Sequence, residues 1–421
     1  MLRRLLTISF ISLAFITQAF SEDVGAYIVM NAKNGKVLSQ KVAYQKMSPA
    51  STTKIAIVSY VLSTPGLDLN QKVVVPEEAV RMVSNYEKTL DNFSKYPSYV
   101  LQRNSSVAGL KKGEILTIKD LLYANMLVSG NDAANTLAYY WGDGSIEKCM
   151  ERVNRFVESL GCANTHFKNP HGLHHPEHLS SAYDLALLAR YAMQNPTFRQ
   201  LAKATSYKRA KTNKQPEIIW KQANKLVVSG NPYFYEPATG IKTGYHAFAQ
   251  RCLVASAERG DRTLIAVVLR CPERKEQFSV PKKLFQQFLS EEKTSRTLIE
   301  EGPIQLKREI RGQNVPLELK ATSGYSISFY PSEEPEIRTV VEWEDRGFPV
   351  TKDQHVGTVH IFADGDEVAS VPLVSAQERK ATWWQRLVEF QGFLKQHSGI
   401  FLSLGVIALF GMALFFRSNR S

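Results

Sequence analysis

The chain has 421 residues, of which 44% are hydrophobic and 22% are charged. This balance excludes general disorder and allows two or three folded domains. Lysine and arginine outnumber aspartate and glutamate by 52 to 40, and this net charge of +12 would suit a nucleic-acid-binding protein, but the two ends of the chain argue against that partner.

The first segment predicts a secretory signal peptide over residues 1–21. Two arginines precede an apolar run over 5–16, and the small residues Ala19 and Ser21 follow. This order is typical of a cleaved signal, and the apolar run is short for a membrane span. We therefore expect export, with a buried first helix as the alternative.

Residues 22–290 alternate helix and strand patterns, as an α/β or α+β domain does. The patterns predict a strand hairpin over 26–41, helices over 51–62, 118–141, 145–160 and 181–194, a strand end at 240–245, a hairpin over 251–271 and a closing helix over 282–289. The 118–141 stretch is broken at Ser129, and serines suited to N-capping begin the next two helices. Hairpins on both sides of a helical middle indicate one antiparallel sheet with helices packed against it.

Beyond residue 300 the pattern changes to short alternating strands that glycine and proline separate. These predicted strands cover 304–310, 317–321, 326–330, 340–343 and 357–362. We expect a small all-β stalk domain over 295–378, between the first domain and a membrane.

The C-terminal segment predicts a membrane anchor. Residues 400–416 carry no charge, and two arginines follow at once. Length and flanking charge favour a transmembrane helix over 399–416 with a cytoplasmic tail over 417–421. Helical spacing of aromatic and apolar residues predicts an amphipathic juxtamembrane segment over 379–398. The rest of the chain would lie outside the cytoplasm, on the periplasmic side of the inner membrane; a buried C-terminal helix is the alternative.

Export changes the meaning of the charge and of the cysteines. Removal of residues 1–21 leaves a net charge of +10, whose natural counterparts outside the cytoplasm are anionic lipids and acidic wall polymers rather than DNA. Four cysteines allow three disulfide pairings, and buried thiols are the favoured alternative. They are Cys149, Cys162, Cys252 and Cys271.

Three short motifs carry candidate chemistry: Ser51-Thr52-Thr53-Lys54, Ser129-Gly130-Asn131 and Lys242-Thr243-Gly244. On a helix, positions i and i+3 share one face, so the Ser51 hydroxyl and the Lys54 amine can meet. A neutral lysine can take the serine proton and so activate a nucleophile. A second cation lowers the pKa of such a lysine, and Lys242 could supply that charge.

The remaining motif residues suit substrate handling. The Thr243 hydroxyl could hold a carboxylate, and Gly244 leaves room for an extended substrate along the strand. Ser129 could relay a proton to a leaving amine, while the Asn131 amide orients a carbonyl. Each motif is a weak signal alone, but the three in this order are a strong one. The structural alternative is an N-cap, a turn and a solvated strand edge.

The motif set resembles that of the serine penicillin-recognising enzymes. The chain is similar to the low-molecular-mass D-alanyl-D-alanine carboxypeptidases of the penicillin-binding protein 5 type, serine peptidase family S11. The resemblance covers about 24–290 and includes PASTTK, SGNDAAN, NTHFKNPHGL with SSAYDLALLAR, and GIKTGY with LVASAERGDRTLIAVVL. It continues more loosely to the C-terminus, and members of this family are exported, carry a β-rich stalk and are held at the membrane by the C-terminus.

The resemblance implies that Ser51 attacks the carbonyl between two terminal D-alanines of a peptidoglycan stem pentapeptide, with Lys54 as general base and Ser129 as proton relay. Backbone N–H groups of Ser51 and Tyr245 would form the oxyanion hole. The residues implied in substrate binding are Asn131, Lys242, Thr243 and Gly244. β-Lactams would trap the serine as an acyl-enzyme, and the resemblance implies no cofactor or metal.

The chain departs from the family pattern at one position. Many relatives place an arginine just before the final helix, where it helps to hold the terminal carboxylate, whereas the counterpart here is Gln277. Arg274 is near enough in sequence to substitute, and we assign it that role as a hypothesis.

Several other readings stay open. The histidines at 171, 174, 175 and 178 cluster but match no zinc spacing, so we expect no metal site. The basic, aromatic stretch 85–112 predicts a loop beside the active site.

A β-lactamase, a D,D-endopeptidase or a catalytically idle tethered binding protein of the cell envelope could use the same scaffold.

Overall fold

The computed structural model describes residues 6–9, 24–84, 86–87, 95–309, 316–344 and 349–380. Among these, residues 24–291 form a larger compact unit. A smaller unit contains the described residues from 292 onward together with Leu6–Ser9. The two units are described separately below.

The larger unit is built on a five-stranded antiparallel sheet with the strand order β10-β11-β12-β2-β3. Its strands are β10 (Ala238–His246), β11 (Gln250–Arg259), β12 (Arg262–Cys271), β2 (Ala26–Asn31) and β3 (Val37–Lys41). The hairpins from the two ends of the unit join where β12 pairs with β2, for example Ala266 opposite Val29. The antiparallel sheet expected from the sequence is therefore confirmed as the main sheet of this unit.

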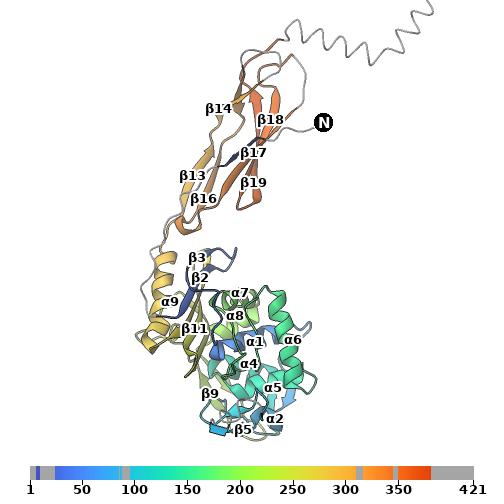
Figure 1. Cartoon of the computed structure of the whole chain (residues 1–421), viewed down its shortest axis with the longest axis vertical. Helices are drawn as coiled ribbons and strands as arrows, with labels where there is room; N and C mark the ends of the chain where they lie inside the picture. Colours follow the sequence, from blue (N-terminus) through green and yellow to red (C-terminus); the bar gives the residue numbers. More distant parts are fainter. Residues whose placement is uncertain are drawn as a thin grey trace, which may run out of the picture. The chain divides into compact units, whose positions relative to one another are not determined.

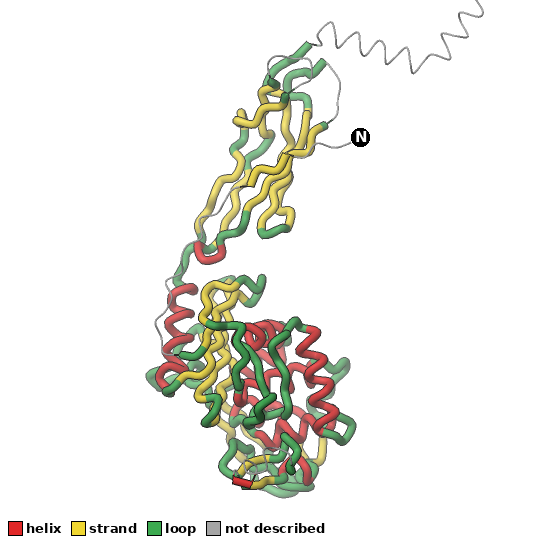
Figure 2. Tube along the Cα trace, in the orientation of Figure 1, coloured by secondary structure: helices red, strands yellow, loops and turns green. Residues whose placement is uncertain are grey.

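Helices cover both faces of this sheet. One face carries α1 (Lys54–Leu62), α4 (Ile118–Leu127), α5 (Asn131–Trp141), α6 (Ile146–Ser159), α7 (Ala182–Ala192) and α8 (Pro196–Lys203). The other face carries α9 (Arg274–Leu289), and Figure 1 shows this separation. Figure 2 shows the same arrangement, with the helices on both sides of the strands.

Strand alternation divides the apolar interior into two cores. Because successive side chains point to opposite faces, Ile28 packs with the helix cluster and Val29 packs beneath α9. Val267 and Val268 alternate in the same way. α1 is apolar on nearly all sides and lies in the middle of the larger core, as expected for a helix without a solvated face.

The helix starts follow the predicted capping signals. Ser145 and Ser181 accept N–H bonds at the starts of α6 and α7, as predicted from the sequence. Thr117 and Asp120 form a capping box at the start of α4. The predicted break within 118–141 is also present, since α4 and α5 are separate helices.

The predicted start of the last helix is wrong, because α9 begins at Arg274 rather than near 282. Pro281 lies inside the helix, where it removes one backbone hydrogen bond. Gln277 and Phe278 are buried against the sheet, and this tertiary packing offsets the local cost of the proline.

Shorter elements complete the larger unit. They are η1 (Ala50–Thr53), β4 (Lys72–Val74), α2 (Glu77–Val80), β5 (Met82–Val83), β6 (Leu101–Gln102), β7 (Ile115–Thr117), β8 (Ser206–Arg209) and β9 (Ile218–Lys221). These strands form the pairs β4–β7, β5–β6 and β8–β9. All four cysteines are buried and free.

The smaller unit is all-β in its described residues apart from the short η2 (Pro331–Glu333), which confirms the expected all-β domain. Its main sheet has the order β1-β17-β18-β19-β15-β14, beside a β13–β16 pair. The strands are β1 (Leu6–Ser9), β13 (Thr294–Ile299), β14 (Gly302–Arg308), β15 (Leu317–Ala321), β16 (Tyr325–Phe329), β17 (Ile337–Trp343), β18 (His355–Ala363) and β19 (Asp366–Ser375). Leu319, Ile361 and Leu373 are central to its core.

Two sequence predictions fall largely outside the described residues. Of the predicted signal peptide only β1 is described, and it pairs with β17. The predicted membrane helix over 399–416 lies wholly outside. Within the described ranges, no helix combines the length and the apolar character needed to cross a membrane.

Candidate active site

The Ser51 side chain lies in a tight turn that leads directly into α1. Thr52 Oγ1 donates to the Pro49 carbonyl at 2.7 Å, and Thr53 Oγ1 donates to the Ala50 carbonyl at 2.8 Å. Ala50 adopts φ +49°, a left-handed conformation that is costly for a residue with a Cβ. The turn is therefore held in a strained shape, and it presents a half-buried serine at the start of a buried helix.

Lys54 is fully buried and fully hydrogen-bonded. Its Nζ lies 3.0 Å from Ser51 Oγ, 2.7 Å from Asn131 Oδ1 and 2.8 Å from the His171 carbonyl oxygen. Two carbonyl oxygens accept from Nζ, and the Ser51 hydroxyl can accept from the protonated amine or donate to the neutral one. The contact between Ser51 and Lys54 predicted from their spacing is thus present, and Asn131 belongs to the same network.

Burial is the main cause that lowers the pKa of Lys54 well below its ordinary value. The nearby Lys242 cation lowers this pKa further, whereas the Asp132 carboxylate raises it. A lysine whose pKa is lowered in this way loses its proton more readily than an exposed lysine, and the neutral amine can then accept a proton from a hydroxyl.

Ser129 lies in the connection between α4 and α5. It adopts φ +59°, and its Oγ is buried without a hydrogen-bond partner among the described residues. A buried hydroxyl that no neighbour satisfies is unusual and marks a position where a substrate atom or a water can bond. Strain and an unused polar group at one residue are typical of functional sites.

Asp132 holds this connection in place, a role that no local pattern in the sequence indicated. Its buried carboxylate accepts N–H bonds from Ala108 at 2.8 Å and from Gly109 and Leu110 at 2.9 Å. Burial raises the pKa of Asp132, and these N–H bonds oppose that shift. The carboxylate therefore fixes a neighbouring loop to the start of α5.

The third motif lies on β10, at the edge of the sheet. Lys242 is buried, donates to the Thr243 carbonyl at 3.0 Å, and has its pKa lowered to about 7 by burial. A Cβ placed on Gly244 would lie 3.0 Å from the Ser51 nitrogen. Only glycine lets the strand approach the serine turn this closely, so the first and third motifs are in direct contact.

The side chains around Lys242 and Gly244 differ in their exposure to solvent. Tyr245 is 61% exposed, and the guanidinium of Arg251 lies 4.7 Å from the centre of its ring. Gln277 is buried, and its Nε2 donates to the Cys252 carbonyl at 2.7 Å. Arg274 is exposed at the first residue of α9, and the described contacts do not bring it to the three motifs.

The segment 169–173 supports the serine turn, and this role was missed from the sequence. The His171 carbonyl binds Lys54, while the His171 ring bonds the Tyr99 carbonyl at 3.0 Å. A Cβ on Gly172 would lie 1.9 Å from the Ala50 carbonyl oxygen. The available signal was the Asn-Pro-His-Gly-Leu sequence over 169–173, in which a glycine stands two residues after a proline.

The other histidines have structural contacts. His178 Nε2 lies 2.8 Å from Thr53 Oγ1, and His246 Nε2 lies 3.1 Å from Ser48 Oγ. The His174 ring stacks on Phe248 at 4.1 Å. Over the described residues, no group of three histidine, cysteine or acidic side chains is arranged to hold a metal ion.

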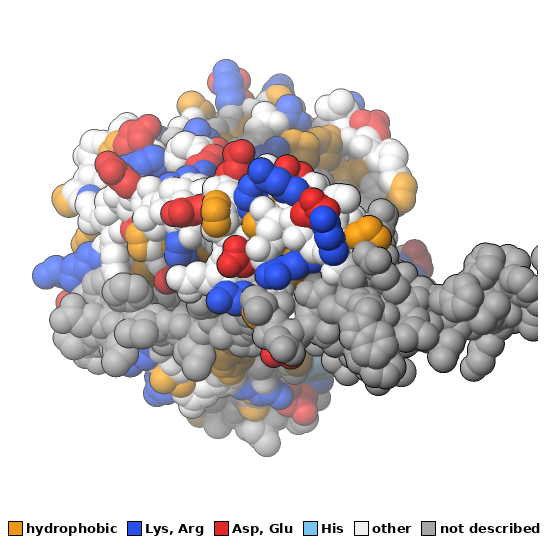
Figure 3. All heavy atoms as spheres, turned by 90° about the horizontal axis from the view of Figure 1, so that it is seen from above, with side chains coloured by type: hydrophobic (Ala, Val, Ile, Leu, Met, Phe, Trp, Pro, Cys, Tyr) orange, Lys and Arg blue, Asp and Glu red, His pale blue; other side chains and the backbone are white. Residues whose placement is uncertain are grey.

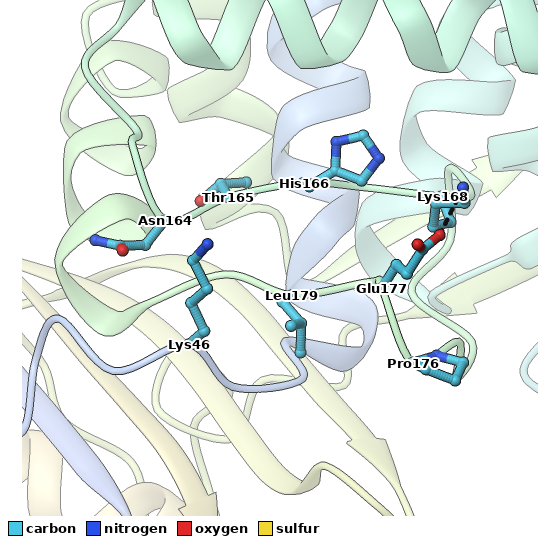
Figure 4. A pocket seen from close by; sticks show the side chains of 8 residues that line it. All are labelled: Lys46, Asn164, Thr165, His166, Lys168, Pro176, Glu177 and Leu179. Atoms are coloured by element: carbon cyan, nitrogen blue, oxygen red, sulfur yellow. Dashed lines mark ion pairs between the residues drawn. The ribbon is translucent and has the colours of Figure 1, made fainter.

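A separate pocket of about 400 Å³ lies beside the 164–179 segment. Figure 4 shows its lining, in which Lys168 and Glu177 form an ion pair at 2.9 Å. None of its lining residues belongs to the three motifs. This pocket is therefore separate from the candidate site at the Ser51 turn.

Two family models match the chain. Residues 14–273 match the Peptidase S11 model, described as D-alanyl-D-alanine carboxypeptidase. Residues 294–381 match the model of the penicillin-binding protein 5 C-terminal domain. The first match covers more than half of the chain.

Individual proteins show the same similarity. The D-alanyl-D-alanine carboxypeptidase DacF of Bacillus subtilis is 27% identical over 373 residues, which are 86% of this chain and 88% of the relative. The D-alanyl-D-alanine carboxypeptidase of Streptomyces sp. strain K15 is 34% identical over 263 residues, 60% of this chain and 82% of the relative. The solved structure of penicillin-binding protein 5 from Haemophilus influenzae has a TM-score of 0.57 and 25% identity, and the match covers 86% of this chain and 99% of that one.

Proposed function

We propose that Ser51 is the nucleophile and Lys54 the general base of this chain, which belongs to the D-alanyl-D-alanine carboxypeptidase family and is a serine-type D-Ala-D-Ala carboxypeptidase. The observation that carries this assignment is the 3.0 Å contact between Lys54 Nζ and Ser51 Oγ, made by a buried lysine whose pKa is lowered. A neutral amine at hydrogen-bond distance can activate a serine hydroxyl.

In the acylation step, Ser51 Oγ attacks the carbonyl carbon between the two terminal D-alanines, and its proton passes to Lys54 Nζ. The backbone N–H groups of Ser51 and Tyr245 stabilise the oxyanion of the tetrahedral intermediate. Collapse of this intermediate breaks the C–N bond, and Ser129 Oγ relays a proton to the leaving amine. Free D-alanine departs, and water then hydrolyses the Ser51 ester.

The substrate in this proposal is a peptidoglycan stem pentapeptide that lies along β10. This strand is at the edge of the sheet, so an extended peptide can pair with it as an added strand. Asn131, Lys242 and Thr243 bind the peptide, and β-lactams acylate Ser51 because they present a reactive amide to the same groups. The protein acts in cell-wall biosynthesis and remodelling.

The proposed location is the outer side of the inner membrane. The sequence of residues 1–21 supports export, and the apolar stretch within 399–416 supports a C-terminal anchor. The juxtamembrane segment 379–398 and the tail 417–421 complete this proposed topology.

Release of D-alanine tests the proposed reaction. We expect the purified protein to liberate one D-alanine per pentapeptide, and we expect Ser51→Ala to lose this activity while it keeps its unfolding temperature. Full activity in Ser51→Ala would refute the assignment of the nucleophile.

Two further assays distinguish the alternative functions. Sustained rapid nitrocefin hydrolysis would indicate the β-lactamase alternative, and cleavage of cross-linked dimers would indicate the endopeptidase alternative.

A further inference from the structure

The substrate of a D-Ala-D-Ala carboxypeptidase ends in a free carboxylate, and the motif residues leave this charge without an accessible cation. Lys54 is fully buried, and its Nζ has three hydrogen-bond partners inside the protein. Lys242 is 1% exposed and bonds the Thr243 carbonyl. A terminal carboxylate that leaves water needs a charge-assisted partner, and a guanidinium fits it best.

Neither residue near the start of the last helix supplies this partner. Gln277 is neutral and buried, and its amide nitrogen bonds the backbone carbonyls of Cys252 and Gly244 at 2.7 and 3.5 Å. Arg274 is exposed, and no described hydrogen bond or ion pair directs it toward β10. The sequence-based assignment of Arg274 therefore receives no support from its contacts.

Arg251 lies on the strand that pairs with β10, close to the third motif. It lies on β11 directly opposite Tyr245, the residue that follows Gly244 on β10. Side chains two residues apart on a strand share a face, so Thr243, Tyr245 and Arg251 lie on the same side of the sheet. Diagonal neighbours of this kind are roughly 7–8 Å apart, a gap that a long side chain spans.

The guanidinium of Arg251 is also available for a ligand. It lies over the exposed Tyr245 ring at 4.7 Å, which orients it while leaving its N–H donors free to bond. No carboxylate among the described residues forms an ion pair with Arg251. Glu276 raises the pKa of the Cys271 thiol and Arg251 lowers it, so both charges lie near that thiol. No hydrogen bond or ion pair joins Glu276 to Arg251 among the described contacts.

The geometry points to Arg251 as the residue that binds the C-terminal carboxylate of the substrate, with Thr243 Oγ1 as its second donor. This assignment rests on the proposed function and names the residue that restricts the enzyme to substrates with a free terminal carboxylate. A fork of two guanidinium N–H groups on one carboxylate gives both affinity and orientation. Arg251 is a specificity residue and takes no part in proton transfer.

Two acyl thioester substrates that differ only in a carboxylate on the leaving group test this inference. For Arg251→Gln we expect kcat/KM to fall about 10–100-fold on the substrate with the carboxylate, since a hydrogen bond to a charged group is lost, and to stay unchanged on the other. Arg251→Lys should recover part of the loss, and the matched control Arg274→Gln should leave both values unchanged.

An equal loss on both substrates would show a structural role and overturn the inference, as would no loss on either. The proposed function is tested separately in the same samples, because wild-type protein must form a covalent penicillin adduct on Ser51. If the adduct forms but Arg251→Gln keeps the full preference for the carboxylate, only this inference fails. If no adduct forms, the proposed function itself fails.

Discussion

The proposed base of this site has neighbours that act on its pKa in opposite directions. Burial and Lys242 lower the pKa of Lys54, and Asp132 raises it. Only the neutral amine can accept the Ser51 proton, so the rate of acylation should rise with pH as Lys54 loses its own proton. The acid side of the pH–rate profile therefore reports the balance among these groups.

Asp132→Asn tests this balance. Removal of the carboxylate charge lowers the pKa of Lys54 further, so we expect the acid limb of kcat/KM to move to lower pH. An asparagine cannot accept all the N–H bonds that Asp132 accepts, so we also expect a loss of about 2–4 kcal/mol in the free energy of unfolding. Stopped-flow acylation over a pH series and urea unfolding measure the two effects.

Asp143→Asn is the matched control, because Asp143 is an exposed carboxylate paired with Lys148 and Arg152. It should leave the acid limb where it is. An acid limb that stays in place in Asp132→Asn, or that moves to higher pH, would contradict the electrostatic account of Lys54.

For single residues, the sequence predicted the contacts between side chains that lie a few positions apart along the chain. Ser51 and Lys54 meet because they are three residues apart on a helix, and Lys242 lowers the pKa of Lys54 as expected. The roles of Asp132 and of the His171 carbonyl depend on loops that are distant in sequence. No local pattern could place those loops beside α1, so these groups could not be predicted.

At the scale of elements, the Ser51 turn depends on a second segment packed against it. Gly172 adopts φ +87°, and a Cβ there would lie 1.9 Å from the Ala50 carbonyl and 2.9 Å from the Ser51 nitrogen. The turn and the 169–173 segment therefore form one unit that a side chain at 172 would separate.

Gly172→Ala should displace the nucleophile. We expect a loss of about 3 kcal/mol in the free energy of unfolding, from the left-handed backbone together with the overlap, and a much slower acylation by penicillin. Gly66→Ala is the control, since Gly66 has φ +67° and no atom within 4 Å of its added Cβ. It should cost about 1 kcal/mol and leave acylation unchanged. Equal effects of the two changes would show that the contact with the Ser51 turn is unimportant.

Elements that begin with a local signal were predicted from the sequence. Ser145 and Ser181 mark two helix starts by side-chain capping, and the break near Ser129 separates α4 from α5. The start of α9 was not predictable, because Gln277 and Phe278 are helical through their burial against the sheet and not through local preference. The strand order also depends on long-range pairing, although hairpins at both ends of the unit indicated it.

At the scale of the whole molecule, the charge surplus suits an enzyme of the cell envelope. Figure 3 shows lysine and arginine side chains interspersed with aspartate and glutamate on the face that it presents. On that face the basic residues do not form the continuous field typical of nucleic-acid binding. The net charge of +10 that remains after the proposed removal of residues 1–21 instead fits attraction to anionic lipids and acidic wall polymers.

Membrane fractionation tests the proposed location. We expect the full chain to sediment with membranes through a high-salt wash, because an apolar span does not depend on charge. A variant that ends at residue 378, and so lacks both the juxtamembrane segment and the apolar span, should move to the soluble fraction and still bind labelled penicillin. Sedimentation of the truncated variant with membranes would place the anchor elsewhere in the chain.

The central claim is that Ser51 becomes acylated with Lys54 as its base. Mass spectrometry of the intact protein and of its peptides after incubation with penicillin tests it most directly. We predict one added penicillin per chain, carried by the peptide that contains Ser51, with formation of the adduct slowed about 10²–10⁴-fold in Lys54→Met. An adduct on another residue, or undiminished acylation in Lys54→Met, would contradict the account.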